Sequence, residues 1–556
     1  MPTWSNDKWR KFEVNRFMRY THSILSACIV WGVVFCASGQ AASGAGRDLQ
    51  DTEGALRLTL AESIGMALDS DEQIVAAEAE RKAATYALSA ARRAKGPTVS
   101  WSSQAYRIGG RNYSSARSNH AMYGDPHTEF LQTGVVTDPD SESAIAPVYS
   151  VQTVGDYARN NTFANSWNLT VPIYTGGQME GQITERRYRL NQADLKLENT
   201  RQAVRYHAAE AYANLVHRGN LTKVAKDAVD RAMNQLALIS TQYEEGAAAK
   251  ADVLTMEVRL ADYRQNLASA QGAEEAARYS LASAVGLPQG TDIRATDVFS
   301  YEPYPKDLPA CEDYALAHRA DGLAADYAIK AAEAQKDAAK SGYRPKVTGV
   351  AGQSIASNKP FRSERSNAWE AGVNISWNIF DNGVTAANVD QAKAAMERYR
   401  AEAQNMRKNI ALETRNAYVE MKVAEANIKV AADAVTKAET SQMIAQVRYE
   451  EGVDILLNVT DAQEALTRAK SNYYTALYQY NLSRAALEKA MGVPVGLDVV
   501  SYVEAEQNGA SSSGAIRAAR LSKEEEERIP YEVTPEEPAS SEKTVQEMAR
   551  GKGNGK

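Results

Sequence analysis

The feature that most constrains the fold is an internal repeat with an offset of 206 residues. The sequence QYEEG at 242–246 returns as RYEEG at 448–452. The same offset aligns further pairs without a gap: Gly286 with Gly492, Ala211 with Ala417, and Ile173 with Ile379. The chain from about residue 163 to 290 therefore repeats as 369 to 496, so the fold must be built from two similar halves.

Each half contains one very long helical stretch. From Val384 to Glu451 the sequence has neither Gly nor Pro, and at about 1.5 Å per residue such a helix is on the order of 100 Å long. Small and apolar residues recur there at a mean spacing of about 3.5, which predicts coiled-coil packing. A second apolar stripe, which includes Leu412 and Val419, indicates a neighbour on each side, as in a wall of helices. An isolated antiparallel coiled coil would explain one stripe only.

The repeated YEEG phrase is interpreted as the tip of a helical hairpin. Gly246 and Gly452 fall where each long helix ends, as expected for a cap with a positive φ angle. Helical pattern then resumes and runs to Gly286 and Gly492.

Strands are predicted before each long helix, because polar and apolar residues alternate strictly at 369–379 and nearly so at 163–173. Both follow an earlier strand-like stretch, at 346–355 and 98–107, so each half contains a strand hairpin. The segments have the length of tilted transmembrane strands, although a half-buried strand of a soluble sandwich fits the alternation equally well. The residues expected to face the membrane are Trp167, Leu169, Val171, Trp369, Val373, Ile375 and Trp377.

The two hairpins differ in their loops. The second loop is about a dozen residues long, whereas the first covers roughly residues 108–156 and is rich in Gly, Ser, Asn, Asp and Tyr. A loop of that length is expected to be functional or disordered.

The ends of the chain are expected to lie outside the fold. Basic residues, an apolar run from Ile24 to Phe35 and small residues near Ala42 predict a signal peptide at residues 1–42. Lipidation of Cys36 is a weaker alternative, because Phe35 stands where a small residue is expected. Charge blocks and few apolar residues predict a disordered tail at 504–556.

Composition gives no support to an enzyme or a nucleic-acid-binding protein. The formal net charge of −7 disfavours binding to nucleic acid. The 6 His residues form no ligand-like cluster, and the sequence contains no Walker loop, dinucleotide fingerprint or nucleophile motif with partners. We therefore expect no catalytic residues, no cofactor and no metal site.

The order of the motifs resembles the TolC family of outer-membrane export channels over about residues 57–500. The motifs are LTLAESI, RAKGPTVS, VPIYTGGQ, AEAYANL, QYEEGAAAKADVLTME and LASAVGLP, followed by YRPKVTG, SWNIFDNG, TRNAYVEM, RYEEGVDILLNVTDAQ and KAMGVP. The resemblance implies a mixed α and β fold: long antiparallel coiled-coil helices forming a trimeric periplasmic α-barrel, continuous with a 12-stranded transmembrane β-barrel to which each chain gives 4 strands. The strands suggest a trimer independently, because four strands cannot close and three chains supply twelve.

The resemblance also implies partners and sites. A periplasmic adaptor protein and an inner-membrane pump, driven by ATP or by protons, would work with the channel. Hairpin tips that meet the adaptor would be Gly246, Gly452, Val453, Ile455 and Leu456, although turn geometry requires the glycines in any case. A periplasmic gate would use Asp252, Tyr449, Asp454, Asn458 and Asp461, although Asp252 and Asp461 are also suited to helix N-terminal turns.

The sequence thus predicts two repeats, at 57–290 and 310–496, each made of a helix, a strand hairpin, a long helix, a tip and a returning helix. The predicted function is an export conduit in the bacterial outer membrane, with most of its mass in the periplasm, for small molecules, proteins or both. The alternative is a secreted structural coiled-coil or adhesin-like protein, which would have no reason to interrupt its helices twice with paired strands.

Overall fold

The structure, a computed structural model, describes residues 56–107, 127–137, 144–154, 161–357, 359–360 and 366–521. The described residues from 57 onward belong to one compact unit, and the description below concerns that unit. The predicted signal peptide at 1–42, with Cys36, lies outside the described residues.

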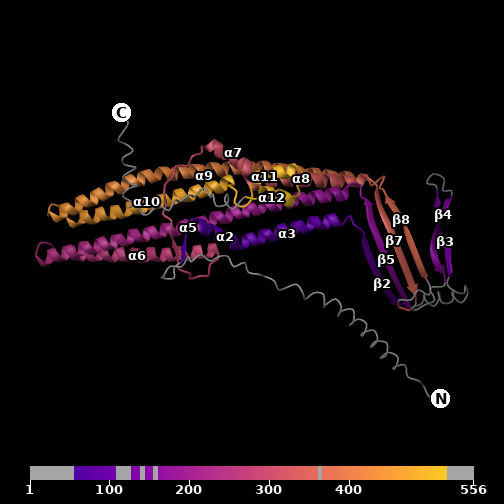
Figure 1. Cartoon of the computed structure of the whole chain (residues 1–556), viewed down its shortest axis with the longest axis horizontal. Coiled ribbons are helices and arrows are strands. Elements are labelled where there is room, and N and C mark those ends of the chain that lie inside the picture. The colour runs from indigo at the N-terminus through magenta and orange to yellow at the C-terminus, as the bar shows by residue number, and fades with distance from the viewer. Residues whose placement is uncertain are drawn as a thin grey trace, which may run out of the picture. The chain divides into compact units, whose positions relative to one another are not determined.

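Four long helices dominate the chain (Figure 1), and their bounds follow the predicted offset. The long helices α5 (Gln178–Glu244) and α9 (Val384–Glu450) have 67 residues each. The returning helices α6 (Lys250–Val285) and α10 (Leu456–Met491) have 36 residues each. Both pairs begin 206 residues apart, which is the offset read from the sequence.

Glycines end the helical elements at equivalent places. Gly246 and Gly452 have φ angles of 79° and 69° at the two tips, and Gly286 and Gly492 cap the returning helices with φ angles of 75° and 71°. Positive φ costs an L side chain about 1 to 2 kcal/mol, so these positions favour glycine.

The helices form a layer in which sequence-distant segments lie side by side. Helix α5 packs between α3 (Glu72–Arg93) and α8 (Ala320–Ala339), and α8 also packs against α9. Helix α6 packs along α5 and α10 along α9, which makes the two helical hairpins (Figure 1). The shorter helices are α2 (Leu60–Ser70), α7 (Leu308–His318), η2 (Lys340–Tyr343), α11 (Val499–Gln507) and α12 (Ser512–Ala519).

A four-stranded antiparallel sheet follows the predicted hairpins. Its order is β2 (Thr98–Arg107), β5 (Asn161–Tyr174), β7 (Lys346–Ser357) and β8 (Ser366–Ser376). Within the described residues β2 and β8 have no strand on their outer edge. Two short strands, β1 (Leu56–Leu58) and β6 (Ile293–Ala295), pair with each other beside the helices.

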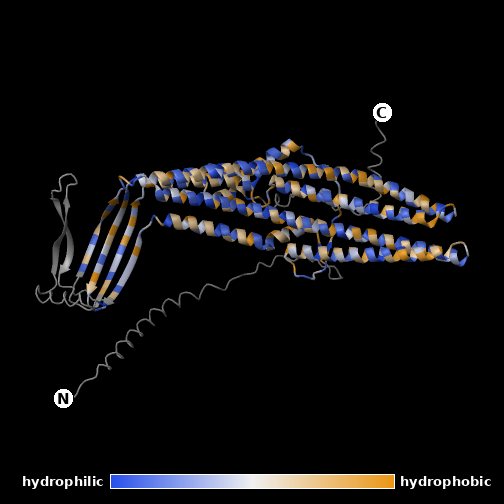
Figure 2. Ribbon diagram, turned by 180° about the vertical axis from the view of Figure 1, so that it is seen from behind, coloured by the Kyte–Doolittle hydropathy of each residue, from blue (hydrophilic) through white to orange (hydrophobic). Residues whose placement is uncertain are grey.

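The register gives this sheet one apolar and one polar face. One cross-strand row contains Trp101, Trp167, Gln353 and Trp369, and the next row on that face contains Val99, Leu169, Ala351 and Ala371. The opposite face carries the row Ser100, Asn168, Gly352 and Glu370. The resulting alternation of hydropathy along each strand is visible in Figure 2.

One expectation about the strands is wrong in part. Strand β8 ends at Ser376, so Trp377 lies beyond the strand, where its indole donates a hydrogen bond of 3.1 Å to the Tyr343 carbonyl. The long loop contains a strand hairpin, β3 (His127–Thr137) and β4 (Ala144–Val154). Its other residues lie outside those described.

The predicted tail is also corrected over residues 504–521. Helix α12 is capped by Ser511, and its Ala515 and Ala519 are buried in a cluster with Leu195 and Tyr327. The tail was predicted to be disordered because it has few apolar residues. The small apolar side chains of α12 nevertheless pack closely in this cluster. Residues 522–556 lie outside the described part of the chain.

Candidate functional site

The two hairpin tips lie at the same end of the long helices, and an apolar cluster joins the hairpins there. Leu456 and Tyr449 of the second hairpin belong to a cluster with Ile239, Val253 and Met256 of the first. One predicted docking residue and one predicted gate residue therefore belong to the cluster that joins the hairpins, although 206 positions separate the two copies of the tip sequence.

The tip of the second hairpin presents exposed apolar side chains. Val453 is 69% exposed and Ile455 is 61% exposed. Leu456, which the sequence analysis grouped with them, is only 6% exposed and belongs to the cluster between the hairpins. Leu456 is therefore a packing residue of this chain, whereas the next residue, Leu457, is exposed.

Asp454 and Asn458 of the predicted gate are in direct contact. The Asn458 amide donates a hydrogen bond to Asp454 Oδ1, and the backbone N–H of Ile455 donates to the same oxygen at 2.9 Å. Asp454 Oδ2 lies 3.3 Å from Arg448 Nε. The hydrogen bond from Asn458, then that from the Ile455 backbone, and the charge of Arg448 lower the pKa of the Asp454 carboxyl.

Tyr449, near the end of α9, links the two hairpins. Its hydroxyl donates a hydrogen bond of 3.2 Å to Gln242 Oε1 at the end of α5. Burial and the nearby charge of Asp252 raise the pKa of the Tyr449 phenol, so the hydroxyl keeps its proton. The tie joins helix ends that are 207 residues apart.

Asp461 stands apart from these contacts. It is exposed on α10, and its side chain makes no hydrogen bond or ion pair with another described residue. Sequence reasoning missed Gln242 and Arg448, although the repeat places Arg448 opposite Gln242 and Asp454 opposite Ala248. That difference between the copies was the available signal for an ion pair in the second tip alone.

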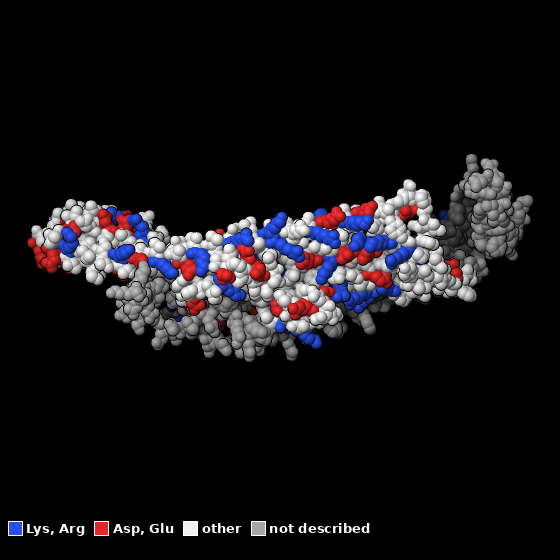
Figure 3. All heavy atoms as spheres, turned by 90° about the horizontal axis from the view of Figure 1, so that it is seen from above, with Lys and Arg blue, Asp and Glu red and all other residues white. Residues whose placement is uncertain are grey.

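Acidic side chains and a hollow lie near the hairpin tips. Figure 3 shows acidic side chains gathered at the tips. A hollow of about 530 Å³ between α9 and α10 is lined by Arg448, Asp454 and Asn458. Among the described residues no group of three or more His, Cys, Asp or Glu is placed to hold a metal ion.

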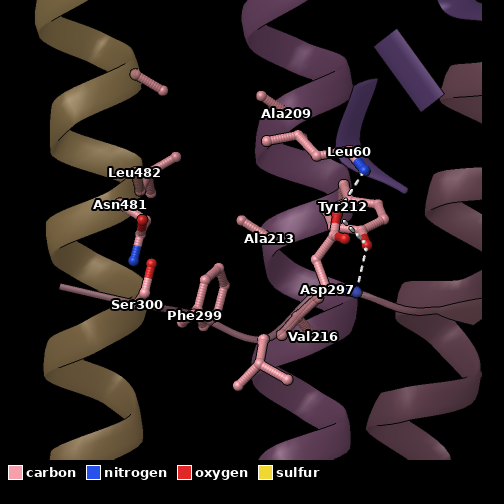
Figure 4. A pocket seen from close by; sticks show the side chains of 12 residues that line it. Leu60, Ala209, Tyr212, Ala213, Val216, Asp297, Phe299, Ser300, Asn481 and Leu482 are labelled. Carbon is pink, nitrogen blue, oxygen red and sulfur yellow. Dashed lines mark hydrogen bonds between the residues drawn. The ribbon is translucent and has the colours of Figure 1, made fainter. Parts of the chain in front are cut away.

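A second cavity, between α5, α10 and the segment after β6, has a volume of about 40 Å³ (Figure 4). Tyr212 closes it, donating a hydrogen bond of 2.9 Å to Asp297. That volume suits about one water molecule, so the cavity is too small for a transported solute.

None of the described helices combines the length and the apolar character that a membrane-spanning helix needs.

Comparisons with known proteins give a consistent result. The family model for the outer membrane efflux protein matches residues 63–287 and 313–493. The alkaline protease secretion protein AprF of Pseudomonas aeruginosa is 22% identical over 446 residues, covering 79% of this chain and 86% of AprF. The toluene efflux pump outer membrane protein TtgF of Pseudomonas putida is 27% identical over 263 residues, which are 47% of this chain and 54% of TtgF.

The fold is similar to that of solved outer membrane proteins. The structure of VceC from Vibrio cholerae superimposes with a TM-score of 0.59 at 18% identity, covering 78% of this chain and 96% of VceC. At that identity the match concerns the fold, which combines long helices and a strand region as described above.

Proposed function

This chain belongs to the outer membrane efflux protein family, and from that premise we propose that three copies form a trimeric export channel. The family places the protein in the bacterial outer membrane, with a large helical part in the periplasm, and its members are channels rather than enzymes. The secreted structural protein considered from the sequence is not supported, because both halves of the chain match the channel family.

The observation that carries the proposed trimer is the unfinished sheet. Strands β2 and β8 have no outer neighbour among the described residues, and Trp369 on the apolar face is 78% exposed. An open edge is not tolerated in lipid, because each unpaired backbone group costs several kcal/mol. Three four-stranded sheets give a closed barrel wide enough for a lumen.

Closure by copies of the chain is consistent with the strand directions. The sheet is antiparallel throughout, so β8 of one copy runs opposite to β2 of the next. The apolar rows around Trp167 and Trp369 would then face lipid, and the polar row with Asn168 and Glu370 would line water.

The tips supply the proposed contacts with partners. We assign adaptor docking to the surface formed by Gly246, Gly452, Val453 and Ile455, since its apolar side chains are exposed at the end of the helices. An inner-membrane pump would supply the energy. The names of the relatives include both a protease secretion protein and a toluene efflux pump component. The proposal keeps both pumps that the sequence analysis named, one driven by ATP and one driven by protons.

The proposed gate uses two kinds of contact. The pair Tyr449 and Gln242 would hold the hairpins together. Carboxylates at Asp454, Asp461 and Asp252, repeated by three subunits, would make a ring that attracts cations. Arg448 reduces the negative charge at Asp454, so the ring is weaker than one built from unpaired carboxylates.

The domain plan also remains part of the proposal: a signal peptide at 1–42, repeats at 57–290 and 310–496, and a disordered tail limited to residues after 521.

Membrane fractionation tests the function as a whole. We expect the full chain in outer-membrane fractions, migrating differently on gels with and without heating. Recovery as a soluble monomer would refute the export channel.

A further inference from the structure

A large hollow lies where the helical layer meets the sheet, and neither the gate nor the docking surface includes it. Its volume is about 1140 Å³, and residues of α3, α5, α8 and α9 line it. The lining residues that carry the argument are Gln182, Glu185, Arg186 and Arg189 of α5, Lys346 of β7 and Gln391 of α9. We call this surface the junction hollow.

The junction hollow lies on the side of the layer that would face the passage. The helices α3, α5, α8 and α9 line it together, so it lies on one face of their layer. Lys346 also pairs with Ser376, and alternation along β7 puts its side chain on the same face as Gly352, in the polar row with Glu370. The polar strand face and the junction hollow are therefore continuous.

The charges in the junction hollow are mostly positive. Arg189 Nε donates to Glu185 Oε1, and Arg186 Nε lies 3.5 Å from Glu185 Oε2, so two guanidinium groups share one carboxylate. The side chains of Arg186 and Arg189 are 49% and 51% exposed, whereas that of Glu185 is 12% exposed. Lys346 is exposed and has no ion pair with another described residue.

The rest of the lining supports anion binding. The long helix α5 begins at the junction hollow, at Gln178, and a helix N-terminus carries partial positive charge. At the start of α9 the N–H groups of Gly383 and Thr385 already donate to the Asp381 carboxylate, so that helix end adds little. Amide side chains such as Gln182 and Gln391 add hydrogen-bond donors, and α3 contributes only alanines, which leave room for a solute. The tips, by contrast, carry Glu450 and Glu451.

We propose that the junction hollow is a transit site for carboxylate-bearing cargo, held by Arg186, Arg189 and Lys346 inside the passage. The proposal rests on the export channel described above, in which three copies would face one lumen. Positive rings favour anions in pores, and planar guanidinium groups match carboxylates. The carboxylates could belong to small solutes or to acidic stretches of an exported polypeptide.

The test is block of the channel by carboxylates added from the barrel side, where they reach the junction hollow before the gate. Purified full-length protein is recorded in planar bilayers while either citrate or a ten-residue glutamate peptide is titrated. In a variant with Arg186→Gln, Arg189→Gln and Lys346→Gln we expect the blocking constant of citrate, of the peptide or of both to weaken at least tenfold. A weaker block by citrate alone would indicate that the cargo is a small solute. A weaker block by the peptide alone would indicate an acidic polypeptide.

Two further variants keep the result interpretable. Arg92→Gln is the matched control. Arg92 lies at the end of α3 that borders the junction hollow, but its side chain is exposed and does not line the hollow. Glu185→Gln releases both arginines and should strengthen the block. If the triple variant does not insert, Lys346→Gln alone must weaken the block relative to Arg92→Gln. Equal block in all variants would overturn the transit site, whereas absence of any conductance in the parent protein would overturn the export channel instead.

Discussion

Removal of the Tyr449 hydroxyl tests how the closed tip is held. Tyr449→Phe keeps the ring in the cluster between the hairpins and deletes only the hydrogen bond of 3.2 Å to Gln242. A hydrogen bond of this kind contributes about 1 kcal/mol net. Gln242 is only partly buried, so water can replace the lost partner without a large additional cost.

The trimer multiplies the effect. If three subunits open together, the closed state loses about 3 kcal/mol, which is roughly a hundredfold change in the ratio of closed to open channels. Single-channel recording in planar bilayers measures that ratio as open probability. We therefore expect Tyr449→Phe to raise the open probability strongly while leaving the amount of trimer unchanged.

The repeat supplies a matched control. Tyr243 lies 206 positions before Tyr449 and is 43% exposed. Its ring lies below Lys250, with 5.4 Å from Nζ to the ring centre, and its hydroxyl makes no hydrogen bond with another described residue. Tyr243→Phe should leave gating unchanged. Equal open probabilities for the two variants, or additive effects of Tyr449→Phe and Gln242→Ala, would refute the tie.

Three other predictions concern the second tip. Asp461→Ala should weaken block by trivalent cations without raising open probability, since Asp461 makes no tie, and Asp454→Ala should change both; identical recordings of the two variants would contradict this division. The pKa of the Asp454 carboxyl is lowered in the folded protein, so its contacts persist above the ordinary carboxyl pKa and are lost as the pH falls through the lowered value. We therefore expect acid to open the channel only below about pH 4. Conductance of the Asp454→Asn variant, compared with that of the parent protein, shows which part of this opening comes from Asp454. Gly452→Asn keeps the positive φ angle and adds bulk where no other atom lies within 4 Å, so we expect normal trimer abundance and lost export; retained export would mean that Gly452 serves the turn alone.

The sequence predicts the helices well and the ends of other elements less well. The absence of Gly and Pro from 384 to 451, bounded by Gly383 and Gly452, predicts α9 to within one residue, because helix length depends on local backbone chemistry. The end of β8 depends on where its pairing with β7 stops at Lys346, which is a tertiary fact. Trp377 therefore continued the alternation without belonging to the strand.

The site was predicted by location rather than by contact. Repeat alignment brought Asp252, Tyr449 and Asp454 to one end of the molecule. It did not show that Leu456 packs inward, nor that Gln242 accepts from Tyr449, because both depend on how two hairpins pack side by side. The sequence also did not predict that α12 is ordered, because this helix is stabilised by packing against α5, and alanines pack closely only when a matching surface is present.

Closure of three sheets into one barrel is the central claim, and cysteine cross-linking between sheet edges tests it most directly. In a background without native cysteines, one cysteine is fixed at Ser102 on β2 while a second is moved along residues 368–376 of β8. Oxidised outer membranes are then analysed on denaturing, non-reducing gels.

We expect cross-linking with a period of two along β8, because alternate side chains share a face, and a covalent product that stops at three chains. Only monomers at every position, or a ladder that continues beyond three chains, would contradict a closed trimeric barrel.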